Sequence, residues 1–191
     1  MFIKNWKTEL LTIPNLLSLF RLILIPFYTI LYLKAQKPQQ FWLAGLILAI
    51  SCLTDAVDGK IARHFHQITN VGKILDPLAD KVTQFTLILC LSLKHPALNP
   101  VLMLFVMKEI FQMILGILYL KQGKMLPGAL WAGKVCTAVL FTSLTSLVVF
   151  PAMPPRLIGS IALTDGFFLI FSLLCYLLAY WGKHGKLQDL E

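Results

Sequence analysis

Six long apolar stretches dominate the sequence and constrain its fold more than any other feature. They lie at roughly 14–33, 41–57, 74–93, 98–120, 130–150 and 157–181. Each is close to the ~20 residues that an α-helix needs to cross a hydrocarbon layer of ~30 Å. Lipid requires backbone polar groups to be paired within their own segment, and unbroken apolar runs favour helices over barrel strands. The sequence therefore predicts an all-α, polytopic membrane protein with six transmembrane helices.

The composition agrees with this interpretation. The chain has 191 residues, of which 58% are hydrophobic and 14% charged, whereas soluble domains are nearer to half apolar and a quarter charged. No linker rich in Ser, Gly or Pro divides it, so residues 1–191 are expected to form a single membrane domain. The four cysteines occur singly in separate apolar stretches, without a C-x-x-C motif, which argues against a disulfide framework or a zinc site.

The distribution of positive charge predicts the orientation of the helices. The chain has 17 Lys and Arg residues, and those that fall on the sparsely charged side are Lys34, Lys37, Lys94 and Arg156. The positive-inside rule then places both termini and the 58–73 loop in the cytoplasm. These basic residues suit anionic lipid head groups, and nucleic acid is not expected as a partner. A short chain without a transit peptide predicts a bacterial plasma membrane.

Residues 1–12 precede the first apolar stretch and carry an amphipathic pattern. Phe2, Ile3, Trp6 and Leu10 fall on one helical face, with polar residues off it. This pattern predicts an interfacial helix along the cytoplasmic leaflet. A frayed tail is the alternative.

Four of the nine acidic residues cluster at the cytoplasmic ends of the second and third stretches. Asp55 and Asp58 are spaced i, i+3, and Asp76 and Asp80 are spaced i, i+4, so each pair lies on one helix face. If these helices are antiparallel neighbours, all four carboxylates can converge. Buried like charges repel and carboxylates near lipid are unfavourable, so such a cluster needs positive charge. Hard oxygen ligands suit Mg²⁺ or Mn²⁺; the alternative is pairing with neighbouring Lys and Arg.

The residues between the aspartates indicate a phosphate-containing ligand. Gly59 and Ala62 are small and leave room beside the carboxylates, and Arg63 can hold a phosphate with two hydrogen bonds. Gly72 lies one turn before Asp76 and would let a ligand approach the backbone closely. Together these residues predict a site for a diphosphate at the membrane surface.

The complete pattern resembles a known signature. It reads Asp55-x2-Asp58-Gly59-x2-Ala62-Arg63-x8-Gly72-x3-Asp76-x3-Asp80. This is similar, at all eight fixed positions, to the signature of the CDP-alcohol phosphatidyltransferase family, a highly specific match. The segment Pro14-Asn15-x2-Ser18-x2-Arg21-x4-Pro26 also resembles the first helix of that family, with Ser18 where Thr is usual.

The resemblance implies a reaction and a set of roles. An enzyme of this family transfers a phosphatidyl group from CDP-diacylglycerol to an alcohol and releases CMP, and family members are commonly homodimers. Asp55, Asp58 and Asp76 would hold two divalent metal ions, with Asp80 as general base and further metal ligand. The CDP-lipid pocket would comprise Asn15, Ser18, Gly59, Ala62, Arg63 and Gly72.

The acceptor alcohol is less clearly indicated. Lys108, Lys121 and Lys134 fall at or toward the cytoplasmic ends of the fourth and fifth helices, where they could hold an acceptor's phosphate; snorkelling lysines are the alternative. The run at 70–81 resembles phosphatidylglycerophosphate synthases, whose acceptor is sn-glycerol 3-phosphate. Those synthases usually carry Arg at the positions of Lys108 and Leu118 and a further Lys near Lys134. These departures keep open a cardiolipin synthase, whose acceptor is phosphatidylglycerol.

Two further acidic residues and one rival function complete the predictions. Glu109 and Asp165 lie within apolar helices, where an ionisable group faces a cavity or pairs with a partner such as Lys. The rival function is a non-catalytic divalent-cation carrier that uses the same carboxylates. A transport path would need polar residues across the bilayer, and the second and third helices have few beyond their cytoplasmic turns.

Overall fold

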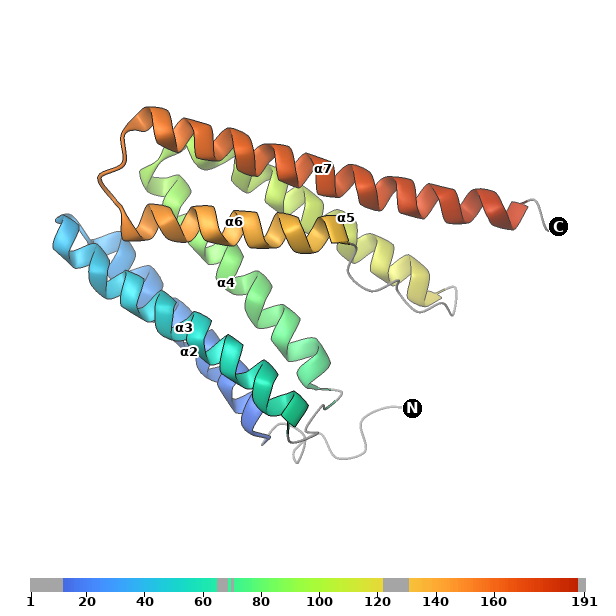
Figure 1. The fold of residues 1–191 in the computed structure, drawn as a ribbon, viewed down its shortest axis with the longest axis horizontal. Coiled ribbons are helices and arrows are strands. Elements are labelled where there is room, and N and C mark those ends of the chain that lie inside the picture. Colours follow the sequence, from blue (N-terminus) through green and yellow to red (C-terminus); the bar gives the residue numbers. More distant parts are fainter. Residues whose placement is uncertain (1–11, 65–68, 70, 122–130, 189–191) are drawn as a thin grey trace. The chain divides into compact units, whose positions relative to one another are not determined.

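The computed structural model describes residues 12–64, 69, 71–121 and 131–188, and this part of the chain is helical, without strands (Figure 1). The all-α prediction is confirmed for these residues. The interfacial helix predicted for residues 1–12 lies outside them, apart from Thr12, and stays a prediction.

Each predicted apolar stretch corresponds to one long helix. These are α2 (Ile13–Lys34), α3 (Pro38–His64), α4 (Gly72–Lys94), α5 (Asn99–Lys121), α6 (Trp131–Val149) and α7 (Pro155–Gln188), with the short 3-10 helix η1 (Pro96–Leu98) before α5. α3 and α7 continue beyond the apolar runs that predicted them, because a helix can project polar residues past the hydrocarbon layer without losing its backbone hydrogen bonds.

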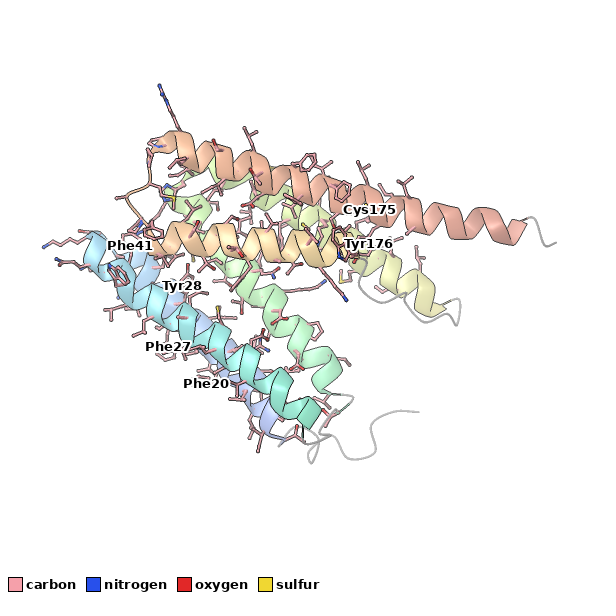
Figure 2. The ribbon with its side chains drawn as sticks, viewed as in Figure 1. Phe20, Phe27, Tyr28, Phe41, Cys175 and Tyr176 are labelled. Carbon is pink, nitrogen blue, oxygen red and sulfur yellow. The ribbon has the colours of Figure 1, made fainter. Side chains whose placement is uncertain are left out.

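Four helical segments in the described part of the chain are long and apolar enough to cross a membrane. They are Ile13–Lys34, Pro96–Leu118, Trp131–Val149 and Pro155–Ala179. Large apolar side chains are exposed along these helices; Phe20 and Phe27, marked in Figure 2, are 42% and 56% exposed. Apolar exposure on this scale suits contact with lipid rather than water.

The chain divides into two compact units, residues 1–90 with 147–152, and residues 91–146 with 153–191. In the first unit α2 and α3 lie side by side (Figure 1). The link between them is short: the Ala35 N–H bonds back to the Leu31 carbonyl at 3.0 Å, and the Gln40 side chain accepts from the backbone N–H of Gln36 and Lys37. Such a short link makes α2 and α3 antiparallel neighbours.

An aromatic cluster closes the same end of this pair. Tyr32 is 1% exposed and its ring lies 5.7 Å from that of Tyr28 and 5.3 Å from that of Phe41. Offset and edge-to-face ring pairs stabilise by about 0.5–1.5 kcal/mol each beyond their buried area. The end of the α2–α3 pair near Ala35 is therefore firmly packed.

In the second unit, α5 packs against α7, and the helices bury ionisable side chains. The Lys108 Nζ donates to Glu109 Oε1 at 2.7 Å and to Gln112 Oε1 at 3.2 Å, with the Lys108 side chain 5% exposed. Of the two arrangements predicted for Glu109, a cavity or a Lys partner, the structure shows pairing with a Lys. Asp165 is 1% exposed and both of its carboxylate oxygens lie 2.7 Å from the Ser143 Oγ.

Replacing Ser143 tests how strongly Asp165 depends on it. Ser143→Ala leaves a buried carboxyl without this donor, and we expect the protein in detergent to lose about 1–3 kcal/mol of stability. Thermal unfolding followed by circular dichroism measures the loss. Ser160→Ala is the matched control, because that exposed hydroxyl bonds only to the Arg156 carbonyl of its own helix. Equal melting temperatures for Ser143→Ala and wild type would show that Asp165 does not rely on this hydroxyl.

Candidate active site

The candidate site lies in the first unit, where one face of α2 carries polar side chains toward α3 and α4. Asn15, Ser18 and Arg21 follow one another at three-residue spacing and are 1%, 0% and 2% exposed. Residues at this spacing share a helix face. Buried polar groups in an otherwise apolar helix are stable only when they are hydrogen-bonded, and each of the three finds its partner on, or just before, α3 or α4.

Arg21 connects two of the predicted aspartates. Its Nη1 lies 2.5 Å from Asp55 Oδ1 on α3 and 2.5 Å from Asp80 Oδ1 on α4. The two carboxylate oxygens can thus be no farther apart than twice that distance. The Arg21 side chain is 3% exposed, whereas those of Asp55 and Asp80 are 50% and 48% exposed. A buried cation therefore stands behind two acidic groups that remain open to a ligand.

Asp76 belongs to the same group of side chains. It precedes Asp80 by one turn of α4, and its Oδ1 accepts a short hydrogen bond from the Ser18 Oγ of α2. Ser18 and Arg21 are one turn apart on α2, so neighbouring turns of two helices are bonded together. The structure thus brings Asp55, Asp76 and Asp80 to a single face of α2.

Gly72, at the start of α4, has a packing role. A Cβ atom on it would lie 2.6 Å from Asn15 Oδ1 and 3.1 Å from Thr69 Oγ1. Thr69 accepts from Asn15 Nδ2 at 3.0 Å and from the Gly72 N–H at 2.9 Å. The absence of a side chain at Gly72 lets Asn15 and the start of α4 approach closely; the ligand-binding role of Gly72 stays a prediction.

The remaining predicted residues lie in α3, α5 and α6. Asp58, Gly59, Ala62 and Arg63 lie in the last turns of α3, but their side chains fall outside the described part of the structure, as does that of Lys121. Lys134 is exposed on α6. Lys108 is buried and bonded to Glu109 and Gln112, so its Nζ already has two partners. The acceptor-binding roles stay predictions.

The donor set can be compared with what a divalent ion requires. Mg²⁺ and Mn²⁺ prefer carboxylate oxygens, and Asp55, Asp76 and Asp80 supply them from two helices. Among the residues whose side chains are described, no three His, Cys, Asp or Glu side chains gather closely enough to hold an ion; the side chain of the fourth predicted ligand, Asp58, lies outside them. The chemistry of the donors fits a divalent ion. In the structure, the positive charge beside Asp55 and Asp80 is that of Arg21.

An apolar pocket lies deeper between the same three helices. It is lined from α2 by Leu24, Ile25 and Tyr28, from α3 by Ile47, Leu48 and Ser51, and from α4 by Thr83, Thr86 and Leu87. Ser51 is one turn from Asp55, and Thr83 is one turn from Asp80. The polar site therefore gives way to an apolar interior within one helical turn.

Comparison with known proteins places these features in context. Residues 11–180 match the CDP-alcohol phosphatidyltransferase family. The chain is 40% identical over 141 residues to the CDP-diacylglycerol–glycerol-3-phosphate 3-phosphatidyltransferase of Aquifex aeolicus, covering 73% of this chain and 75% of that protein.

Two further relatives match over shorter segments. The cardiolipin synthase (CMP-forming) of Streptomyces coelicolor is 43% identical over 76 residues, 39% of this chain and 35% of that protein. The CDP-diacylglycerol–glycerol-3-phosphate 3-phosphatidyltransferase of Escherichia coli K12 is 46% identical over 70 residues, 37% of this chain and 38% of that protein.

Proposed function

The chain belongs to the CDP-alcohol phosphatidyltransferase family, and on that basis we propose that it transfers the phosphatidyl group of CDP-diacylglycerol to sn-glycerol 3-phosphate and releases CMP. Family membership confirms the resemblance seen in the sequence and makes the chain a transferase of phospholipid synthesis. The observation that carries the proposal is that two neighbouring residues of α2 bond to all three aspartates: Arg21 to Asp55 and Asp80, and Ser18 to Asp76.

The choice of acceptor is supported by the longest of the three matches. The Aquifex protein is named for glycerol 3-phosphate, and the match covers three quarters of its length. Phosphatidylglycerol is the second candidate, supported by the match to the Streptomyces cardiolipin synthase and by the missing basic residues at Leu118 and near Lys134. The cation-carrier alternative loses its support, because the same carboxylates belong to a transferase signature.

The proposed mechanism assigns each group a step. Asp55, Asp58 and Asp76, with Asp80, would hold two divalent ions, which would neutralise charge on the diphosphate and on the departing CMP. Asp80 accepts the proton of the acceptor hydroxyl. The hydroxyl oxygen then forms a bond to the phosphorus that bears diacylglycerol, and the bond from that phosphorus to the CMP oxygen breaks. Positioning and electrostatics provide most of the acceleration, as in other phosphoryl transfers.

The CDP-lipid pocket is proposed from the residues around the aspartates. Arg63 would pair with a phosphate, and Gly59 and Ala62 would leave it space, while Asn15, Ser18 and Gly72 fix the α2–α4 contact that borders it. The carboxylates of Asp55 and Asp80 are half-exposed, so a substrate could contact them.

We further propose six membrane spans in a bacterial plasma membrane, with both termini and the site in the cytoplasm. α3 has 27 residues and α4 has 23, so at ~1.5 Å per residue they extend about 40 and 35 Å, enough to cross the ~30 Å hydrocarbon layer. Cysteine-accessibility labelling at Lys37 and Lys134 tests the orientation, because the two positions should react from opposite sides. The proposed homodimer rests on family resemblance, and cross-linking in membranes tests it.

The acceptor is tested by release of labelled CMP from CDP-diacylglycerol by membranes that contain the protein. Glycerol 3-phosphate, phosphatidylglycerol, inositol phosphate and serine are added separately, with and without chelator, and the lipid product is identified by mass spectrometry. We expect chelator-sensitive release that is fastest with glycerol 3-phosphate. Fastest release with phosphatidylglycerol would identify a cardiolipin synthase, and no acceptor-dependent release at all would contradict the proposed transfer.

A further inference from the structure

We propose that Arg21 is a positioning residue that acts as an internal counter-ion: it holds Asp55 and Asp80 together in the metal-free enzyme and yields these carboxylates when divalent ions bind. The inference rests on the metal-dependent transfer proposed above. It assigns a role to a residue of the first helix that the signature of eight fixed positions does not include.

A single nitrogen atom of Arg21 connects three helices. One nitrogen atom, Nη1, lies 2.5 Å from a carboxylate oxygen of Asp55 and 2.5 Å from one of Asp80. These oxygens belong to different helices, so the contact joins α2, α3 and α4 at a single atom. Without a cation between them, two ionised carboxylates this close would repel each other. Arg21 therefore stabilises the contact of the three helices before metal is present.

Arg21 is also buried. The Arg21 side chain is 3% exposed, and the next turn of α2 carries Leu24 and Ile25 at the apolar pocket. A guanidinium in such surroundings is stable only when paired, and removing its partners leaves a costly buried charge. In the metal-free protein Arg21 is thus held by these aspartates and is not available to solvent as an orientation charge.

Arg21 and divalent ions would compete for the same carboxylates. Asp55 is the proposed metal ligand and Asp80 the proposed base, and Arg21 contacts the Oδ1 atom of each. A divalent ion at the same carboxylates would be repelled by the guanidinium and would take over its role of neutralising them. Ion pairing by Arg21 and metal binding are therefore opposed, and by linkage each weakens the other by the same factor. Loss of Arg21 should make the metal-free protein less stable and its metal affinity higher.

The experiment compares full-length protein in lipid nanodiscs as wild type, Arg21→Gln and Arg21→Lys, with Arg156→Gln as a matched control at an exposed position of α7. Two quantities are measured: the melting temperature in chelator, and the dissociation constant for Mn²⁺ by electron paramagnetic resonance. We expect Arg21→Gln to melt lower in chelator and to bind Mn²⁺ about tenfold more tightly, since one opposing charge is removed. Arg21→Lys should stay near wild type, because one ammonium nitrogen can serve both oxygens.

The outcomes separate a counter-ion from a merely structural residue. A lower melting temperature with an unchanged Mn²⁺ constant would overturn the proposal, as would an unchanged melting temperature in chelator. If Arg21→Gln does not assemble, the variant that also carries Asp55→Asn and Asp80→Asn removes the repulsion and should assemble again; failure of that variant also overturns it. The melting temperatures in chelator need no metal, so they test the counter-ion role of Arg21 by themselves. If wild type binds no Mn²⁺, that result contradicts the proposed metal-dependent function and not the counter-ion role.

Discussion

Asp80→Asn reduces chelator-sensitive release of CMP from CDP-diacylglycerol by at least about a hundredfold, the lower end of what a general base contributes. The amide keeps the shape of the carboxylate and can still accept a hydrogen bond from Arg21, but it cannot take the proton of the acceptor hydroxyl. Asp76→Asn causes a loss of similar size for a different reason, because it removes a charged metal ligand while Ser18 still has an oxygen to bond.

The comparison uses equal amounts of protein in membranes, with label release followed over time. Glu191→Gln, an acid-to-amide change at the last residue of the sequence, is the matched control and keeps the wild-type rate. Raising the Mn²⁺ concentration should recover part of the activity of Asp76→Asn and none of that of Asp80→Asn, which separates a ligand from a base. Wild-type rates in both variants would remove these aspartates from the mechanism.

Gly72→Ala is the second change for which a large effect is expected. The new methyl group lies 2.6 Å from Asn15 Oδ1, closer than such atoms can approach, so α4 must shift away from α2 or Asn15 must leave Thr69. Overpacking of this kind is destabilising by about 1–3 kcal/mol. A shift at the start of α4 also moves Asp76, one turn later, and we expect CMP release to fall by at least about tenfold, because small misplacements of reacting groups are costly.

Thermal unfolding and CMP release are measured together for this variant. Gly45→Ala is the matched control in the same unit, because the nearest atom to its added Cβ is 4.0 Å away, and it should behave as wild type. Adding Asn15→Ala to Gly72→Ala makes space for the methyl group and should recover most of the lost stability. If Gly72→Ala alone has wild-type stability and activity, the close α2–α4 contact is not required.

Much of this architecture follows from the sequence, because lipid leaves few choices to a backbone. Long apolar runs must become helices, and the i, i+3 and i, i+4 spacing of acidic residues puts them on one face. The same rules do not identify the role of Arg21: the resemblance includes it in the first-helix pattern but gives it no partner. The available signal was its three-residue spacing from Ser18 and Asn15 within an otherwise apolar helix.

Other details could not be derived from such patterns. Thr69 lies before α4, outside any helical periodicity, yet its hydroxyl joins Asn15 to Gly72. The sequence predicts an acceptor-binding role for Lys108, and in the structure its Nζ bonds to Glu109, the next residue. Adjacent residues on a helix point in different directions, so spacing alone argues against this pair. Long side chains at a buried position can nevertheless bend toward each other when no solvent competes.

The tight end of the α2–α3 pair, with Tyr28, Tyr32 and Phe41 packed beside Ala35, makes it a pivot. Arg21 lies about 20 Å along α2 from Lys34, at ~1.5 Å per residue. A tilt of α2 by about 5° around this pivot, over that length, displaces Arg21 by nearly 2 Å, enough to open its 2.5 Å contact with Asp55. A small tilt of α2 would thus loosen the contact of Arg21 with Asp55 while the aromatic cluster stays packed.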